Sequence, residues 1–199
     1  MKAFLIGTLI VASLQVSAQS FEFELGIGSG QPYLIEHIDR SIDIEHGISA
    51  NFYSSLIYRN SDSYFDLNLT FLNVNSTVEG TDWINELPLD GQVSTFTSFL
   101  SLEHLNEKGL VDIGYSFGLG YTREILYLSK ISDIYSERNF TSLNISALVG
   151  KSFSDRIALN LRPMVIWTNP YNSFDSSDWS IASEDLSLLL NLGLSYRIN

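Results

Sequence analysis

The C-terminal segment 186–198 alternates between two kinds of residue. Small or polar side chains stand at every second position, with Leu189 as the exception, and large apolar side chains stand between them at Leu186, Leu188, Leu190, Leu192, Leu194, Tyr196 and Ile198. A period of two predicts a β-strand with one apolar and one polar face. At about 3.3 Å per residue this segment would extend about 43 Å. A tilted strand of that length can cross an apolar layer about 25 Å tall.

The same alternation recurs along the chain and predicts seven more strands, near 21–28, 48–59, 65–72, 95–103, 111–122, 142–153 and 157–168. The connections alternate in length. Four are long, at about 31–46, 75–91, 128–139 and 169–185, and three are short turns near 60–63, 106–109 and 154–155. An even number of strands, with short turns at one end and long connections at the other, is typical of outer-membrane barrels.

Pro163 lies inside the expected strand 157–168. Proline has no N–H to donate, and a closed barrel has no edge strand to hold it. We therefore expect a β-bulge at this position.

The polar faces of the expected strands distinguish a membrane barrel from a soluble one. They consist of Ser, Asn, Thr, Gly, Asp and Arg, whereas a lipocalin-like barrel hides an apolar face inside. The apolar faces would then meet lipid. Aromatic side chains also stand where an interfacial girdle is expected, with Trp167 near one end and Phe21, Tyr58, Phe65, Phe153 and Tyr196 near the other. A soluble periplasmic barrel that binds a small apolar ligand is the alternative.

The N-terminal segment predicts export. Lys2 precedes an apolar run over 3–12, and Ser17 and Ala18 supply the small residues of a cleavage site. We expect a signal peptide at 1–18 and one barrel domain at 19–199. Beyond residue 18 no stretch of 18 apolar residues occurs, which excludes ordinary transmembrane helices. The chain has no Cys, and its formal net charge of −12 argues against nucleic acid as a partner.

These features together resemble a known family. The ending Ser17-Ala18-Gln19, the alternating strands, the Gly-rich segment 114–121 and the Leu-rich last strand resemble the small outer-membrane β-barrel proteins common in Bacteroidetes. That group is similar in architecture to OmpX and the OmpA membrane domain. The resemblance implies an all-β fold, an eight-stranded antiparallel up-and-down transmembrane barrel in the bacterial outer membrane, and it implies no single activity.

The expected strands assign side chains to two surfaces. We expect the lipid-facing surface of the last strand to comprise Leu186, Leu188, Leu190, Leu192, Leu194 and Tyr196. We expect the lumen to hold a charge network of Glu22, Glu24, Arg59, Asp66, Glu103, Asp112, Arg162 and Arg197. Eight strands leave an interior just wide enough for side chains. Charges buried there must pair, so the network indicates a structural plug, with an ion or proton path as the other interpretation.

The long connections carry the remaining candidate chemistry. His37 and His46 stand among acidic residues, which suits either a divalent-metal site or a solvated acidic loop, and the acidic residues are Glu36, Asp39, Asp43 and Glu45. Ser, Asp and His are present for a hydrolytic site, but no spacing selects a set. Other long connections combine acidic with aromatic residues, which suits a protein or glycan partner, and these are Glu79, Asp82, Trp83, Glu86, Asp90, Tyr171, Phe174, Asp175, Asp178, Trp179 and Glu184.

The sequence therefore predicts an outer-membrane barrel with a structural or surface-interaction role and no assigned cofactor, metal or catalytic residue. Its expected partners are membrane lipid and a protein or glycan at the outer loops. A lipid-modifying or proteolytic barrel enzyme remains the alternative function.

Overall fold

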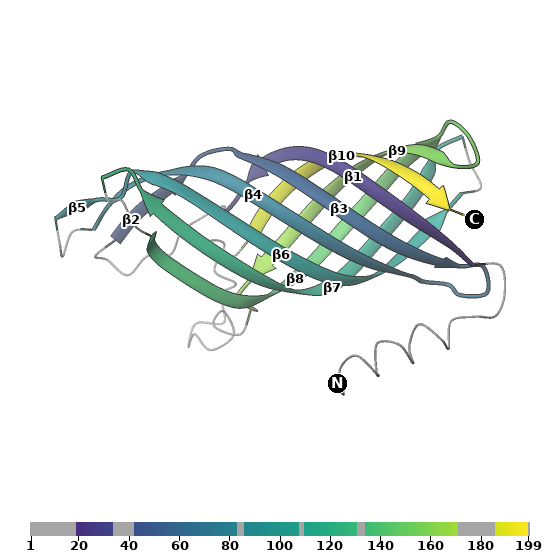
Figure 1. Cartoon of the computed structure of the whole chain (residues 1–199), viewed down its shortest axis with the longest axis horizontal. Helices are drawn as coiled ribbons and strands as arrows, with labels where there is room; N and C mark the ends of the chain where they lie inside the picture. The colour runs from purple at the N-terminus through teal and green to yellow at the C-terminus, as the bar shows by residue number, and fades with distance from the viewer. Residues whose placement is uncertain are drawn as a thin grey trace.

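The structure, a computed structural model, describes residues 19–33, 42–82, 86–107, 110–130, 134–170 and 186–198. Eight long antiparallel strands close into a barrel in the order β1-β3-β4-β6-β7-β8-β9-β10, and β10 pairs again with β1 (Figure 1). Two short strands, β2 and β5, extend the sheet by pairing with β4. The strands are β1 (Gln19–Gln31), β2 (Ile42–His46), β3 (Ser49–Asn60), β4 (Asp66–Asp82), β5 (Leu87–Pro88), β6 (Gly91–Asn106), β7 (Asp112–Leu128), β8 (Ile134–Ser152), β9 (Ile157–Thr168) and β10 (Leu186–Ile198). The expected eight-stranded all-β barrel is confirmed.

The barrel has two unlike ends. Short connections join β3 to β4, β6 to β7 and β8 to β9 at the end where β10 finishes, on the right in Figure 1, and we call this the turn end. The longer connections lie at the opposite end, which we call the loop end. Residues 1–18, which hold the expected signal peptide, lie outside the described residues. Among the described residues, no helix is long and apolar enough to span a bilayer.

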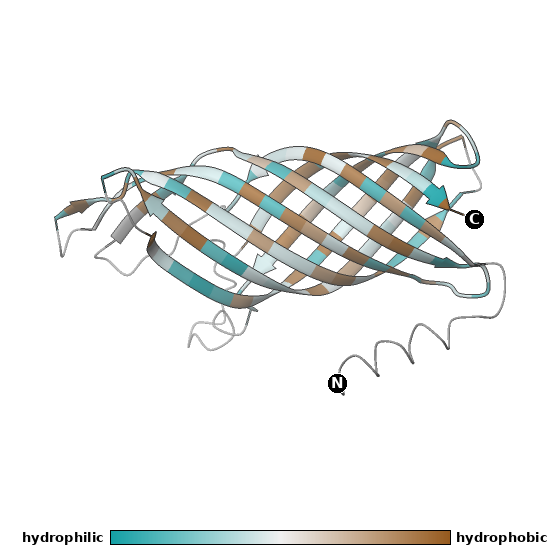
Figure 2. Cartoon of the chain, viewed as in Figure 1, coloured by the Kyte–Doolittle hydropathy of each residue, from teal (hydrophilic) through white to brown (hydrophobic). Residues whose placement is uncertain are grey.

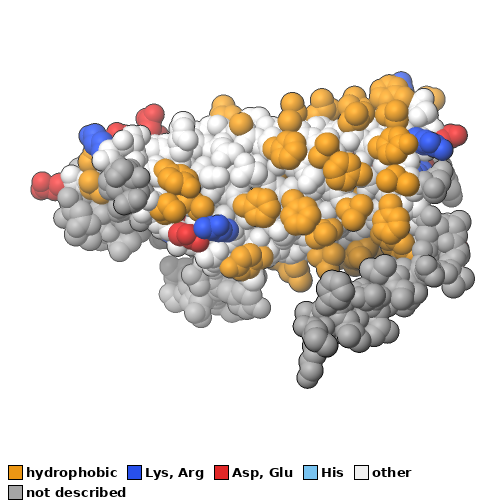
Figure 3. Space-filling view, viewed as in Figure 1, with side chains coloured by type: hydrophobic (Ala, Val, Ile, Leu, Met, Phe, Trp, Pro, Cys, Tyr) orange, Lys and Arg blue, Asp and Glu red, His pale blue; other side chains and the backbone are white. Residues whose placement is uncertain are grey.

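Hydrophobic and hydrophilic residues alternate along the strands (Figure 2). Nearer the turn end the exposed positions are apolar and the buried positions, which face the lumen, are polar. On β10, Leu190 is 53% exposed whereas its neighbour Asn191 is fully buried. The outward apolar side chains gather over the half of the barrel nearer the turn end (Figure 3). Phe21 and Tyr58 pack against each other at the turn-end margin of this surface, with ring centroids 5.5 Å apart. We call this surface the apolar band.

Four adjacent strands are longer than the sequence pattern indicated. The expected long connection at 75–91 is wrong, because β4 continues to Asp82 and β6 begins at Gly91. Likewise β7 extends to Leu128, β8 begins at Ile134, and part of the first connection forms β2. Beyond the apolar band the alternation reverses, so that inward residues become apolar and outward residues polar. Outward polar and inward apolar residues are the usual arrangement of a sheet with one solvated face.

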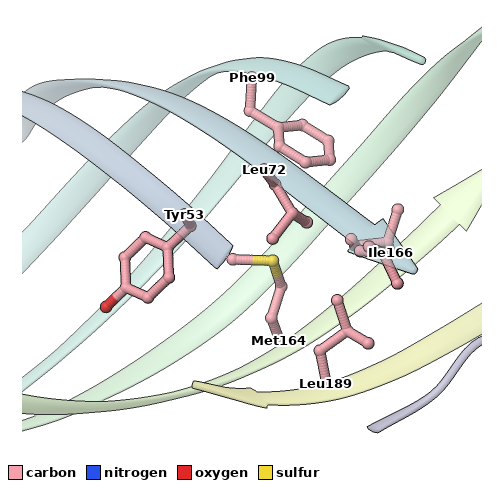
Figure 4. Close-up of a cluster of buried hydrophobic side chains, with 7 residues drawn as sticks. Tyr53, Leu72, Phe99, Met164, Ile166 and Leu189 are labelled. Carbon is pink, nitrogen blue, oxygen red and sulfur yellow. The ribbon is translucent and has the colours of Figure 1, made fainter. Parts of the chain in front are cut away.

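The interior is less polar than the sequence analysis expected. One cluster of buried apolar side chains fills the middle of the lumen (Figure 4), and its members are Tyr53, Leu72, Val74, Phe99, Met164, Ile166 and Leu189. A second cluster lies on the inner side of the extended strands and comprises Val78, Leu89, Val93, Leu126 and Leu128. The polar inner faces described from the sequence are thus interrupted by apolar side chains in the middle of the lumen and on the extended strands.

Pro163 causes no bulge. Its side chain points outward, and β9 keeps one register with β10 through the pair of Leu190 and Pro163. On the other side, the β8–β9 ladder lacks the two pairs expected at Pro163 and Arg162, yet its register is the same before and after this gap. The missing N–H thus interrupts the ladder locally, without the inserted residue that the sequence analysis expected.

Candidate functional site

Arg59 on β3 forms the turn-end half of a buried charge network in the lumen. Its Nε lies 2.8 Å from Glu22 Oε2, its Nη1 2.8 Å from Asp66 Oδ2 and its Nη2 3.3 Å from Glu103 Oε1. Each of the three nitrogens of the guanidinium group therefore faces a different carboxylate. These residues come from four consecutive strands of the sheet, β1, β3, β4 and β6, so the pairing of neighbouring strands brings them together.

Arg162 on β9 continues the network toward the middle of the barrel. Its Nη1 lies 2.7 Å from Glu103 Oε2, and its Nη2 lies 3.2 Å from Glu24 Oε2. All three side chains are at most 3% exposed. Glu103 thus bridges the two arginines, with one carboxylate oxygen toward each. Alternation of charge along the network lets every buried charge meet an opposite charge, which offsets the cost of removing it from water.

Arg197 links the network to the turn-end mouth. Its guanidinium group reaches Glu22 at 3.3 Å and also contacts Glu107, which lies just beyond β6 on the opposite wall. A cavity of about 410 Å³ opens beside this contact, and Arg59, Asp112 and Arg197 are among its lining residues. Asp112 accepts a 2.9 Å hydrogen bond from Ser152 and joins no ion pair among the residues that the structure describes. Seven of the eight expected charges therefore form one network, and Asp112 lies apart.

Three neutral side chains complete the network and were not anticipated. Tyr53 donates its hydroxyl to Glu24 Oε1. Asn160 donates to Glu24 Oε2 at 2.7 Å, and Asn68 donates to Glu103 Oε2 at 3.0 Å. The sequence did contain a signal, because Asn68 stands two residues from Asp66 and Asn160 two residues from Arg162 on the same inward faces. An amide beside a buried charge is a common source of its remaining hydrogen bonds.

Apolar side chains and one tyrosine lie in the lumen between the network and the loop end. The apolar cluster around Tyr53 and Leu72 lies between the charges and the loop end. Closer to the loop end, Tyr33 extends from the end of β1 to the other side of the barrel, where its hydroxyl contacts Glu124 on β7. Its backbone N–H is 3.3 Å from Ser187 Oγ on β10. The described side chains of this apolar cluster therefore lie between the charged part of the lumen and the loop end.

The expected lipid-facing residues of β10 lie on the outer surface of the barrel. Leu188, Leu190, Leu192, Leu194 and Tyr196 are each 45–56% exposed. Leu186, at the loop end of the strand, is only half-buried rather than fully outward. Leu192 lies opposite Ile27 on β1 and Leu161 on β9, so the outward leucines continue the apolar band across neighbouring strands.

Charge is distributed unevenly at the loop end. Segments 31–48, 75–91, 123–141 and 169–186 contain 15 acidic and four basic residues. On the β7–β8 side the charges pair, because Arg123 Nε lies 2.9 Å from Glu137 Oε1. This hydrogen bond lowers the pKa of Glu137 and raises the pKa of Arg123. On the β2–β4 side, Glu45 and Glu79 lie directly opposite each other in the ladder, and both are exposed.

The candidate metal and loop residues fall mostly outside the described part of the chain. This holds for the metal candidates His37, Glu36 and Asp39. It also holds for much of the proposed partner surface, namely Trp83, Tyr171, Phe174, Asp175, Asp178, Trp179 and Glu184, and the side chains of Asp43 and Asp82 likewise lie outside the described part. Within the described ranges, no group of three or more His, Asp or Glu side chains is placed to hold a metal ion. His46 packs against Tyr33, with ring centroids 4.7 Å apart.

Comparison with known proteins identifies relatives in fold. No family model matches the chain, and no curated protein matches it. Among the solved structures that resemble it is OprG from Pseudomonas aeruginosa, with a TM-score of 0.59 and 12% identity over 92% of this chain and 97% of that one. Neisserial surface protein A has a TM-score of 0.53 and 9% identity over 92% of this chain and 99% of that one. Ail of Yersinia pestis has a TM-score of 0.53 and 14% identity over 92% of this chain and 100% of that one. OprG is described as an outer-membrane protein, and this chain has the same barrel fold.

Proposed function

We propose that this chain is a bacterial outer-membrane protein of the small OmpX-like type, exported by a signal peptide at 1–18, that presents a surface for a partner outside the cell. The apolar band of the barrel suits contact with lipid, because apolar side chains on a β-barrel exterior are stable there and costly in water. The fold likeness to an outer-membrane protein supports the same location.

The proposed surface role rests on the unequal lengths of the strands. β4, β6, β7 and β8 contain 17, 16, 17 and 19 residues, whereas β1, β9 and β10 contain 13, 12 and 13. The four longer strands are neighbours and continue past the apolar band at the loop end, together with β2 and β5 (Figure 1). We call this extension the protruding wall. A sheet that leaves the bilayer on one side of the barrel is stable only where its faces are matched to water, as the reversed alternation provides.

The protruding wall offers a strand edge. β8 pairs with β9 only from Ser142 onward, so residues 134–140 pair with β7 alone among the described strands. An open edge presents backbone N–H and C=O groups that a strand of a partner can complete. The charged residues Glu137 and Arg138 on this edge would discourage unspecific pairing and leave recognition to a matching sequence.

The charge of the loop end narrows the class of partner. Ail was solved with a heparin analogue, sucrose octasulfate, which is a polyanion. Fifteen acidic residues against four basic ones in the loop-end segments would repel such a ligand from this chain. We therefore propose a basic protein or an uncharged glycan as the partner at the loops.

We further propose that the lumen is a structural plug and not a conduit. The charge network and the apolar cluster together fill it with paired charges and packed side chains. The enzyme alternative gains no support from the described residues, because their buried carboxylates are all engaged in the lumen network or bonded to Ser152. The soluble alternative needs an apolar ligand cavity, whereas the apolar residues inside this lumen pack against one another.

The proposal is tested by location and exposure together. Cells that express the chain should carry it in the outer-membrane fraction, with a faster gel mobility before heating than after. Since the chain has no Cys, single cysteines report topology. Asn139→Cys on the protruding wall should react with a membrane-impermeant maleimide on intact cells, and Asp62→Cys in a turn should react only after lysis. Reaction of Asp62→Cys on intact cells would overturn the orientation, and recovery in the soluble fraction would overturn the location.

A further inference from the structure

A row of outward side chains marks the boundary between the apolar band and the protruding wall on β4. Asn73 lies directly opposite Phe52 on β3 and Phe96 on β6. Phe52 and Phe96 are 52% and 49% exposed, and Phe96 stacks on Phe71 with ring centroids 6.3 Å apart. An amide thus stands between exposed aromatic rings at the level where the outer surface changes from apolar to polar.

The next outward positions beyond this row carry amides and hydroxyls over two neighbouring strands. We call this surface the amide face, and it comprises Asn73, Asn75 and Thr77 on β4 with Gln92 and Ser94 on β6. Asn73 Nδ2 donates to Thr95 O at 3.1 Å, and Asn75 donates in turn to Asn73 Oδ1. These bonds hold the two amides along the wall, where the Asn75 side chain is exposed.

The amide face lacks the charge that an anionic headgroup requires. Phosphate is bound chiefly by Arg and Lys, and the nearest cation along this row is Arg123, which lies opposite Phe96 but is engaged by Glu137 at 2.9 Å. Further toward the loop end stand Glu79 and Glu45, opposite each other and exposed. Phosphate would therefore meet neutral dipoles and nearby carboxylates rather than a counter-ion.

We propose that the amide face binds the uncharged saccharide headgroup of a glycolipid in the leaflet that surrounds the loop end, and this inference rests on the membrane location proposed above. A lipid whose acyl chains lie along the apolar band places its headgroup at the height of Asn73. Sugar hydroxyls can pair with both the donor and the acceptor of an amide, and the C–H face of a sugar ring can pack on Phe52 or Phe96. The occupant is a neutral glycolipid and not a phospholipid.

The test is lipid retention. The purified chain is inserted into vesicles that contain equal amounts of digalactosyldiacylglycerol, phosphatidylglycerol and phosphatidylcholine with identical acyl chains, and the lipids that stay bound are counted by native mass spectrometry. The wild-type chain should retain the galactolipid in preference to both phospholipids. Asn73→Val with Asn75→Val should reduce that preference about three- to tenfold, the effect of losing one or two hydrogen bonds.

Two further variants make the result specific. Asn139→Val with Thr141→Val alters exposed polar residues on β8 beyond the apolar band and should leave the preference unchanged, while Asn73→Gln with Asn75→Gln keeps the amides and should retain most of it. Provided that the chain inserts and migrates as a heat-modifiable barrel, three outcomes would overturn this inference and leave the proposed function standing. They are equal retention of the three lipids, a preference for phosphatidylglycerol, and an equal loss of preference in the β8 variant. Failure to insert into vesicles would overturn the proposed function, and this inference with it.

Discussion

Arg162 on β9 reaches across the lumen to Glu103 on β6, with 2.7 Å between Nη1 and Oε2 and both side chains almost completely buried. This pair joins two walls of the barrel that share no backbone ladder. Arg162 also pairs with Glu24, and Glu103 pairs with Arg59 through its other oxygen, so this pair connects Glu24 to the half of the network around Arg59. The stability of the lumen should therefore depend on Arg162 more than on any exposed ion pair.

Arg162→Ala should reduce the free energy of unfolding by about 3–5 kcal/mol, because it leaves Glu24 and Glu103 buried without their shared partner. Urea titration of the chain in lipid vesicles measures this loss. Arg123→Ala removes one member of an exposed pair and serves as the control, with little expected change. A loss below roughly 1 kcal/mol for Arg162→Ala would mean that water, rather than Arg162, stabilises the two carboxylates.

Leu190→Arg should cost about 2–4 kcal/mol, because Leu190 lies near the middle of the apolar band and an arginine at the bilayer midplane is unfavourable. Asn191→Ser, at the next position but inside the lumen, should cost clearly less. Stability alone does not distinguish a lipid-facing leucine from one packed in a soluble protein. Leu190→Cys should therefore react with a lipid-soluble thiol reagent in membranes and resist a water-soluble one, and ready labelling by the water-soluble reagent would contradict contact with lipid.

Tyr53 and Gly193 should be energetically coupled. The ring of Tyr53 lies over Gly26 and Gly193, and a Cβ added at Gly193 would collide with the tyrosine hydroxyl. Gly193→Ala should therefore destabilise the barrel by about 1–3 kcal/mol through overpacking, and Tyr53→Phe by about 1.5–3 kcal/mol through loss of the bond to Glu24. The double variant should lose less than the sum of the two, since the phenyl ring lacks the atom that the new methyl group meets. Additive losses in a double-mutant cycle would show that the ring moves freely.

Glu45 and Glu79 should destabilise the tip of the protruding wall, because like charges lie directly opposite each other. Glu79→Gln should slow amide hydrogen exchange over Ile42–His46 about two- to fivefold at low salt. The gain should shrink in high salt, which already screens the repulsion. Asp90→Asn removes a nearby exposed acid that lies beside Ser129, with no acid opposite it among the described residues, and should leave exchange in β2 unchanged. Faster exchange in Glu79→Gln would indicate that the two carboxylates share a stabilising proton or cation.

The sequence by itself determined the strands and their two faces. Alternation at Leu186–Tyr196 and at Phe21–Gly28 is a local property, because successive side chains on a strand point to opposite sides whatever the strand pairs with. The same reasoning placed Glu22, Arg59, Asp66, Glu103 and Arg162 inside the lumen. It missed the far half of β4, where the pattern reverses at Leu72 and Val74, because in the sequence such a reversal resembles the end of a strand.

Only the tertiary structure decided which inward residues meet. Glu24 and Arg162 are far apart in sequence, and their contact depends on barrel closure and on the stagger between strands, neither of which any single strand encodes. The same stagger placed Tyr53 over Gly193 and left Asp112 apart from the other charges. It also set the strand lengths that raise β4, β6, β7 and β8 above the apolar band, since a strand ends where its neighbour can no longer satisfy its hydrogen bonds.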